Sequence, residues 1–202
     1  MPRTAFPPAI RSRPVYGEWQ PRPGAAHLML ADGAGAGAIL DLARQAPALM
    51  AQAHVIYVAG RDGAGQAARL ATINPAQFHT SPTYAAALPR LRKVLADAHM
   101  GLQVYLSGTE GLMGQAQNEA MAAGIPYTAI QTEHRGSRAR RVQCVHCKGI
   151  TDGVTHDPFQ CSHCGLHLFV RDHYSRRIAA FQGVNIDAET PGIVPPPVER
   201  FP

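Results

Sequence analysis

Cys144-Val145-His146-Cys147 and, thirteen residues later, Cys161-Ser162-His163-Cys164 decide how the C-terminal part of this chain folds. They contain all four cysteines of the protein. Two Cys-x-x-Cys pairs at this spacing allow two short turns to close four thiolates around one metal ion, most often zinc at about 2.3 Å from each sulfur. The sequence therefore predicts a metal centre whose ligands are Cys144, Cys147, Cys161 and Cys164.

The surroundings of the cysteines favour a structural metal. Gly149 and Gly165 follow the two pairs and suit the positive φ that such turns tend to need. Two disulfides would need an oxidising compartment, and no charged-then-apolar signal segment precedes residue 30, so we expect a cytoplasmic protein. Iron uses the same paired spacing and stays open beside zinc. Four thiolates leave no position for substrate, so we expect the metal to support folding rather than catalysis.

Length and charge set further bounds. The chain has 202 residues, enough for one medium domain and a small metal-stapled unit that its apolar core alone would not hold together. No run of about 18 apolar residues is present, so no membrane span is expected. The net charge of +5 comes from clustered arginines, which we interpret first as local electrostatics.

Upstream of the cysteines, apolar runs alternate with helix-like stretches, which is typical of a parallel sheet with helices on both faces. The expected strands are 26–31, 54–60, 78–80, 102–106 and 125–130, and the expected helices are 38–43, 66–70, 84–99 and 112–123. We therefore predict an α/β protein, a Rossmann-like, doubly wound, parallel five-stranded sheet followed by a four-cysteine zinc ribbon.

Composition divides the chain into four parts. Residues 1–24 are proline-rich and predict an extended arm, residues 25–133 form the α/β domain, residues 134–185 form the zinc ribbon with basic flanks, and residues 186–202 predict an extended tail. Within the arm, the single tryptophan Trp19 either pins the arm onto the domain or faces a partner. Between the cysteine pairs, turn signals predict a hairpin of 150–154 with 156–159.

Two glycine loops are candidate nucleotide sites, because a glycine turn before a helix lets backbone amides approach a pyrophosphate. The candidate cofactor-binding residues are Gly33, Gly35, Gly37 and Gly108. Asp32 places a carboxylate where the diphosphate would lie, which opposes binding. A tight turn with close helix packing is the alternative interpretation.

The stretch from Val104 to Met113, with the loop after the first strand, resembles the nucleotide-binding half of the ferredoxin reductase family. Three positions depart from that family, in which a cysteine stands at Ser107, a proline at Thr109 and usually a glycine at Asp32. The residues before the first strand are also too few for a flavin-binding barrel. Hydride transfer by this chain alone is therefore not expected.

The order of a reductase-like half, a four-cysteine ribbon and the motif of residues 168–180 resembles the DmmA-like small subunit of bacterial dimethylamine monooxygenase. The resemblance implies a multisubunit, haem-dependent enzyme that demethylates dimethylamine to methylamine and formaldehyde. It also implies that haem, FMN and iron–sulfur groups belong to partner subunits, a haem-bearing catalytic subunit and a flavin and iron–sulfur reductase subunit.

Three functions remain open at this point. The first is an accessory subunit that docks the catalytic and reductase subunits, and the second is an NAD(P)H- or flavin-binding component of electron delivery. The third is nucleic-acid binding through the arginines before the ribbon, although few aromatic residues lie among them; these are Arg135, Arg138, Arg140 and Arg141. No catalytic residue is predicted in this chain. The candidate partner-binding residues are Arg171, His173, Tyr174, Arg176 and Arg177, which could equally form an internally salt-bridged surface.

Overall fold

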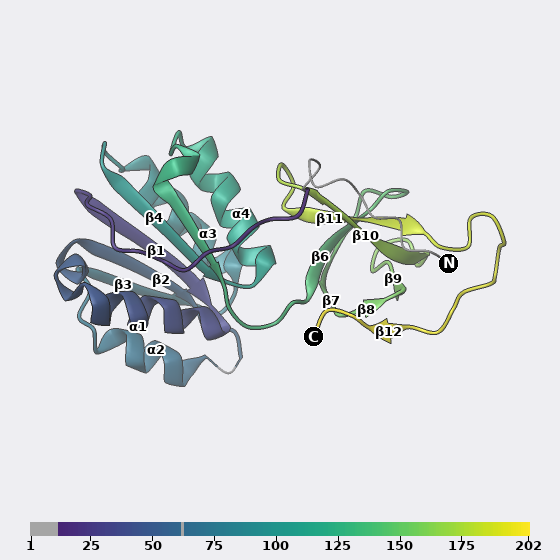
Figure 1. Ribbon diagram of the computed structural model, residues 1–202, viewed down its shortest axis with the longest axis horizontal. Coiled ribbons are helices and arrows are strands. Elements are labelled where there is room, and N and C mark those ends of the chain that lie inside the picture. Colours follow the sequence, from purple (N-terminus) through teal and green to yellow (C-terminus); the bar gives the residue numbers. More distant parts are fainter. Residues whose placement is uncertain (1–11, 62) are drawn as a thin grey trace.

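The computed structural model describes residues 12–61 and 63–202, which form two units side by side (Figure 1). The first unit contains a parallel five-stranded sheet of order β3-β2-β1-β4-β5. Its strands are β1 (Ala26–Asp32), β2 (Ala53–Val58), β3 (Gln77–Ser81), β4 (Leu102–Gly108) and β5 (Ile130–His134). Its α-helices are α1 (Ala36–Gln45), α2 (Ala64–Ala71), α3 (Tyr84–Ala96) and α4 (Glu110–Ala122). The predicted doubly wound architecture is confirmed.

The central strands are apolar on both faces because helices cover both. In β1, Leu28 and Leu30 belong to a core cluster with residues of α3 and α4, whereas Met29 and Ala31 belong to a second cluster with residues of α1 and α2. All four side chains are fully buried. Near-continuous apolar strands of this kind are typical of a parallel sheet between two helical layers.

The last strand of this sheet lies later in the chain than predicted. The expected strand 125–130 is wrong, because Tyr127–Ala129 form a 3-10 turn (η3) and β5 begins only at Ile130. Pro126 is extended and starts that turn. In β5 itself Ile130 and Glu133 are buried, so the pattern is too polar to resemble a central strand.

The described part of the N-terminal arm, residues 12–24, contains no helix or strand and runs from the second unit, where Ser12 Oγ donates to the carbonyl oxygen of Asp172 at 2.8 Å, across the first unit (Figure 1). Trp19 is only 5% exposed, its Nε1 donates to the carbonyl oxygen of Leu106 at 3.2 Å, and its ring lies edge-on to Tyr105. Trp19 therefore pins the arm to the sheet. Residues 1–11 of the predicted arm lie outside the described residues.

The second unit is a mixed sheet of order β7-β6-β11-β10-β9. Its strands are β6 (Arg140–Cys144), β7 (Ile150–Val154), β9 (Phe159–Gln160), β10 (His167–Ser175) and β11 (Ala180–Asn185). The central strand β11 is parallel to its neighbour β6, and the other pairs are antiparallel. A small core of apolar side chains, including Val142 and Phe181, lies beneath it.

The hairpin predicted between the cysteine pairs is wrong. β7 pairs with β6, β9 pairs with β10, and the two-residue strand β8 (His156–Asp157) pairs with β12 (Val198–Glu199) from the tail. The tail bends at residues 186–190 and turns at residues 191–192, where the Ile193 amide donates to the carbonyl oxygen of Thr190 at 3.1 Å, and its end then docks on the second unit. Phe201 completes this docking, because the Arg140 guanidinium lies 4.0 Å from the ring centroids of both Phe201 and Phe181.

Candidate metal centre and glycine-loop cleft

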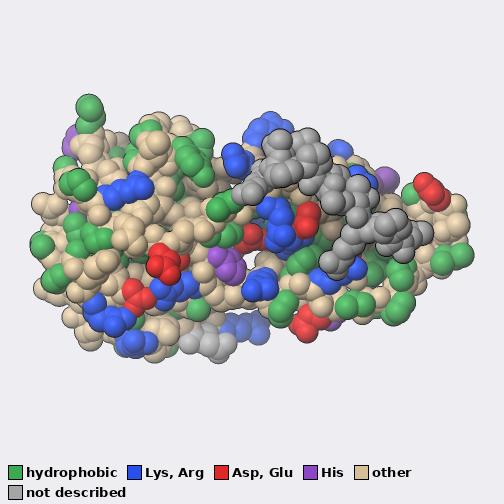
Figure 2. Space-filling model, viewed as in Figure 1, with side chains coloured by type: hydrophobic (Ala, Val, Ile, Leu, Met, Phe, Trp, Pro, Cys, Tyr) green, Lys and Arg blue, Asp and Glu red, His purple; other side chains and the backbone are tan. Residues whose placement is uncertain are grey.

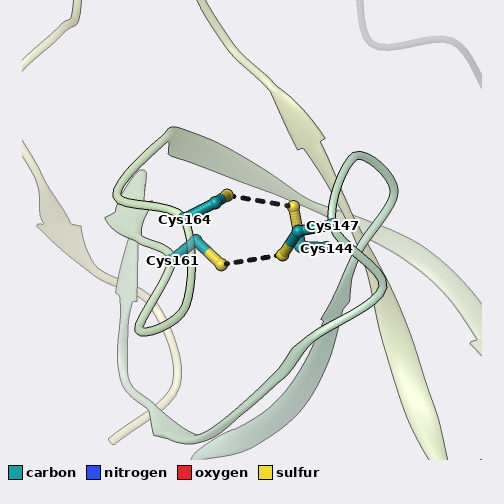
Figure 3. Close-up of side chains that lie close together, drawn as sticks. All are labelled: Cys144, Cys147, Cys161 and Cys164. Atoms are coloured by element: carbon teal, nitrogen blue, oxygen red, sulfur yellow. Dashed lines mark hydrogen bonds between the residues drawn. The ribbon is translucent and has the colours of Figure 1, made fainter.

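The four cysteines come together at one end of the second unit, on two turns that face each other (Figure 3). In the first turn the Lys148 amide donates to the carbonyl oxygen of Cys144, and in the second the Gly165 amide donates to that of Cys161, each at 3.0 Å. Both Lys148 and Gly165 have positive φ, at 63° and 75°. The left-handed residue of the first turn is therefore Lys148 and not the predicted Gly149.

Gly149 is needed for a different reason. A β-carbon there would lie 2.8 Å from the β-carbon of His163, so the His163 side chain fits only against a glycine. From this position His163 Nε2 lies 2.9 Å from the carbonyl oxygen of Ile150. The contact joins the second turn to the strand that follows the first.

The sulfur positions fit one tetrahedral metal ion. All four Sγ atoms lie within 4.8 Å of one another, with Cys144 and Cys164 3.9 Å apart and Cys147 and Cys161 3.7 Å apart. A tetrahedron with a metal–sulfur distance of about 2.3 Å has edges of about 3.8 Å, whereas a disulfide would bring two sulfurs to about 2.05 Å. The donor set therefore fits a metal bound by four thiolates.

The backbone around the sulfurs favours negative charge. The Gly149 amide donates to Cys147 Sγ at 3.4 Å. Burial raises the pKa of Cys161, but the amides of Cys164 and His163 and the neighbouring thiols lower it to about 6. At Cys164 the Leu166 amide lowers the pKa, but burial and the neighbouring thiols raise it to about 12, so the thiols share their protons unevenly. Amide donors of this kind are the usual support of a thiolate that binds a metal.

In the first unit the two glycine loops meet at the carboxyl edge of the sheet, and Asp32 fills the space between them. Its Oδ1 accepts a hydrogen bond from the Thr109 amide at 2.8 Å, and its Oδ2 accepts one from Thr109 Oγ1 at 2.7 Å. Thr109 is also the N-cap of α4, with its Oγ1 accepting from the Leu112 amide. Burial raises the pKa of Asp32, and the Thr109 donors act in the opposite direction. A carboxylate of the chain itself thus takes the amide and helix end that a phosphate would use.

The two loops also pack directly on each other. A β-carbon at Gly35 would lie 2.5 Å from the carbonyl oxygen of Ser107, and one at Gly108 would overlap the Asp32 carboxylate. Gly33 has φ +44° and starts the 3-10 turn η1 (Gly33–Gly35). Ser107 is fully buried beneath this contact. The structure thus brings Gly33, Gly35 and Gly108 together, and close packing accounts for Gly35 and Gly108.

Gly37 lies apart from this contact, beneath the side chain of Arg135. Arg135 joins three parts of the first unit: its Nε contacts Glu133 at 2.6 Å and its Nη2 contacts Asp41 of α1 at 2.7 Å, while Glu133 also accepts from the Trp19 amide at 2.7 Å. A cleft of about 510 Å³ is lined by these same residues. Arg135, Glu133 and the Trp19 amide are thus already engaged with one another, in a network that fastens the arm.

The predicted partner-binding residues differ in exposure. Tyr174 is buried, with its ring 5.0 Å from Phe181, whereas Arg171, His173, Arg176 and Arg177 are exposed. The register of β10 shifts between Arg171 and Tyr174. The shift displaces Asp172, which pairs with the buried Arg140 at 2.7 Å.

Most of the arginines proposed for nucleic-acid contact are engaged within the chain. Arg141 pairs with Asp152 at 2.9 Å, and Arg135 and Arg140 have the partners described above. Among the described residues, only Arg138 of this group makes no ion pair. The basic stretch before the ribbon is therefore mainly internal electrostatics.

Sequence reasoning missed the Asp32–Thr109 contact and the placement of Arg140 between two rings. It also missed His54, which accepts a hydrogen bond from Arg90 Nε at 3.1 Å. An aspartate at the end of a strand opposite a threonine after another strand could have suggested the first contact. The sequence around Arg140 does not indicate its placement between two rings, and the sequence around His54 does not indicate its hydrogen bond with Arg90. In both cases the partners come from distant segments of the chain.

Comparison with known proteins bears on both units. The sequence model described as "Dimethylamine monooxygenase subunit DmmA-like, N-terminal domain" matches residues 8–130, and that of the corresponding C-terminal domain matches residues 141–184. This chain belongs to the DmmA-like family. The DmmA-like chain thus carries both domains of the family in order, and the predicted resemblance to this family is confirmed.

One curated relative is the "Heme-dependent oxidative N-demethylase delta subunit" of Ectopseudomonas mendocina (strain ymp). It is 35% identical over 101 residues, which are 50% of the DmmA-like chain and 58% of the relative. The DmmA-like chain thus spans little more than half the length of this relative.

Two solved structures are similar to the DmmA-like chain at low identity. Phthalate dioxygenase reductase is 14% identical with a TM-score of 0.47, covering 67% of this chain and 46% of its own. A flavohemoglobin from Malassezia yamatoensis is 16% identical with a TM-score of 0.43, covering 58% and 33%. In the described part of the DmmA-like chain, no helix combines the length and apolar character needed to cross a membrane.

Proposed function

We propose that this chain is an accessory subunit of a multisubunit, haem-dependent dimethylamine monooxygenase, in which it docks the haem-bearing catalytic subunit and the flavin and iron–sulfur reductase subunit. The observation that carries the proposal is the match of both units, residues 8–130 and 141–184, to the DmmA-like family. The relative named as a delta subunit of an oxidative N-demethylase supports the same assignment.

The filled glycine-loop cleft supports an accessory role over electron delivery. Asp32 already accepts the Thr109 donors, and Gly35 lies against Ser107. A pyrophosphate at this place would meet a carboxylate at short range, and like charges repel strongly where water is scarce. In this proposal the first unit has the Rossmann-like fold but binds no nucleotide, because Asp32 takes the donors that a phosphate would use.

The metal centre fits a structural role in the second unit. Cys144, Cys147, Cys161 and Cys164 would hold zinc, with iron as the less favoured ion, and the ion would supply a cross-link between the two turns. Four thiolates complete the coordination shell, so the chain's own contribution is to keep the thiolates charged through the amides of the turns.

The test is to prepare the complex from one organism with and without this chain. We expect the chain to co-purify with the catalytic and reductase subunits, and we expect reductase-driven dimethylamine oxidation to fall at least about tenfold when it is left out, because docking positions the electron donor. The proposal is wrong if the chain stays free and the remaining subunits turn over dimethylamine at the same rate.

A second candidate function is retained because a strand, a glycine turn and a helix do follow one another at β1 and α1. In that case the chain would bind NAD(P)H or a flavin and take part in electron delivery. Titration of the purified chain with NADPH and with FMN, followed by fluorescence, distinguishes the two. Saturable binding below the millimolar range would favour this candidate, and no binding would favour the accessory role.

A further inference from the structure

The turn between β10 and β11 is held firmly against helix α4 of the first unit. A β-carbon at Gly114 would lie 2.8 Å from that of Ala179 and would overlap the Tyr174 hydroxyl. Asn118 Nδ2 donates to the carbonyl oxygen of Arg177 at 3.0 Å. The backbone that carries the end of the β10 motif is therefore fixed in place by contacts from both units.

This fixed turn presents two uncompensated arginines. Arg176 and Arg177 are both exposed, and neither makes an ion pair with any residue in the described ranges 12–61 and 63–202. Arg92 on α3, by contrast, has its charge compensated, because its guanidinium group forms two hydrogen bonds to the Glu119 carboxylate, each at 2.8 Å. Lys and Arg side chains are numerous on the second unit and at its junction with the first (Figure 2).

A narrow cleft lies beside Arg176, between the arm, α4 and the 3-10 turn η3. Its volume is about 30 Å³, close to that of one water molecule, and its lining includes Val15, Met113 and Tyr127. Val15 is 73% exposed and Tyr127 is 56% exposed, so two large apolar side chains stand at the edge of the cleft in contact with solvent. Such side chains next to arginine are typical of protein interfaces, where tyrosine and arginine are enriched.

We propose that Arg176, Arg177, Val15 and Tyr127, here called the junction surface, dock an acidic segment of another subunit of the demethylase complex. The inference rests on the proposed function for the identity of the partner and adds the surface and its chemistry. Paired carboxylates on the partner would neutralise the two guanidinium groups, for which arginine offers bidentate hydrogen bonds. The exposed Val15 and Tyr127 side chains would pack against apolar atoms of the same segment.

The junction surface differs from the five partner-binding residues predicted from the sequence. Tyr174 is buried, packs against Phe181 and Gly114 and also lines the narrow cleft, so it lies behind the exposed residues of the junction surface. Val15 belongs to the arm and Tyr127 to the first unit. The surface thus exists only where the arm, α4 and the second unit meet.

Charge reversal tests the proposal without disturbing the core. We expect R176E/R177E to weaken binding of the chain to the purified partner subunits by about tenfold or more, measured by biolayer interferometry at 50 and 200 mM salt. The matched control is R61E/R69E, which makes the same change of charge at exposed positions at or beside α2. The control should bind like the unchanged chain. Equal circular dichroism and equal metal content in both variants establish that the fold is kept.

The outcomes separate this inference from the proposed function. If the unchanged chain binds and R176E/R177E binds equally well, the junction surface is wrong while the accessory role stands. An equal loss in R61E/R69E would also overturn it, because the effect would then be one of net charge. If the unchanged chain binds none of the partner subunits, both proposals fail. We also expect Val15→Asp to weaken binding to the partner subunits. Unaltered binding of this variant would show that the arm is not part of the junction surface.

Discussion

Asp32 acts as an internal anion at the end of β1. Its two oxygens accept the Thr109 amide and hydroxyl, and Thr109 in turn caps α4. A neutral side chain without acceptors would leave these donors unsatisfied in a part-buried site. The residue therefore couples two strands and one helix through a single carboxylate.

Removing this carboxylate should destabilise the chain. We expect Asp32→Ala to lower the free energy of unfolding by about 1–3 kcal/mol, the usual cost of leaving buried partners unpaired. Urea unfolding measures the change. Asp97→Ala is the matched control, because Asp97 forms only an exposed pair with Lys93 and should cost less than about 1 kcal/mol. Equal effects in the two variants would contradict the role given to Asp32.

His54 should make stability depend on pH. Burial, together with the charges of Arg90 and His79, lowers the pKa of His54 to about 4 from its usual 6.5. As the pH falls below 6.5 the unfolded chain takes up the proton first, so stability is lost between pH 6.5 and about 4 and then levels off.

Because His54 is only partly buried, we expect its titration to lower the free energy of unfolding by about 1 kcal/mol over this pH range. His54→Gln keeps an acceptor near Arg90 and removes the titration. Its unfolding free energy should change less than that of the unchanged chain between pH 7 and pH 4.5, whereas the exposed His99→Gln should behave like the unchanged chain. Parallel pH curves for all three proteins would show that His54 contributes nothing.

At the scale of elements, the close approach of the two glycine loops sets the geometry of the sheet edge. The φ of Gly35 is −60°, which any residue adopts, so only the contact with Ser107 requires glycine there. Gly65 of α2 offers the contrast, because nothing lies within 4 Å of its ideal β-carbon.

We therefore expect opposite effects from the same substitution. Gly35→Ala must displace backbone and should destabilise the chain by about 1–3 kcal/mol. Gly65→Ala should stabilise it by about 0.5–1 kcal/mol, because alanine favours a helix. Thermal unfolding of the two variants provides the measurement. A tolerated alanine at Gly35 would mean that the two loops are free to separate.

The elements also show how far the sequence determines the fold. Long periodic or apolar stretches such as β1, β2 and α4 were predicted at nearly the right place, because local pattern and burial agree there. β5 was misplaced, and the strands between the cysteine pairs were given the wrong partners: β7 and β9 pair with the neighbouring β6 and β10, and β8 pairs with β12 of the tail, which no local pattern indicates.

In the candidate sites, too, features encoded in a short stretch of sequence could be predicted and contacts between separate segments could not. The four cysteines could be predicted because their spacing alone brings them together. Lys148 could not be predicted as the left-handed residue of its turn, because a glycine follows it and is the stronger local signal. The role of Asp32 depends on a threonine 77 residues later, and no local pattern gives that pairing.

At the scale of the whole molecule, the two units have separate cores joined at the junction between α4 and the turn after β10. We expect Cys161→Ser to release the metal and to unfold the C-terminal unit while the first unit stays folded, because a small unit of this kind depends on its metal. Metal analysis and circular dichroism follow the second unit.

In the same experiment, the fluorescence emission of Trp19 reports separately on whether the first unit is folded. Trp19 is the single tryptophan of the chain and lies buried against β4, so its emission should stay that of a buried indole in Cys161→Ser. A red shift that accompanies metal loss would show that the junction makes the units unfold together. Addition of a chelator to the unchanged chain should reproduce whichever result is seen.

The parallel pairing of β6 with β11 bears on the order in which the second unit forms. Parallel neighbours need a crossover, and here the crossover, residues 145–179, contains three of the four cysteines and begins next to the fourth. A metal that joins Cys144 to Cys164 leaves only residues 165–179 to close before β11 can pair. During synthesis both turns leave the ribosome before β11 does. The ion can therefore serve as the folding nucleus of the ribbon, and refolding should be faster when metal is present from the start than when it is added late.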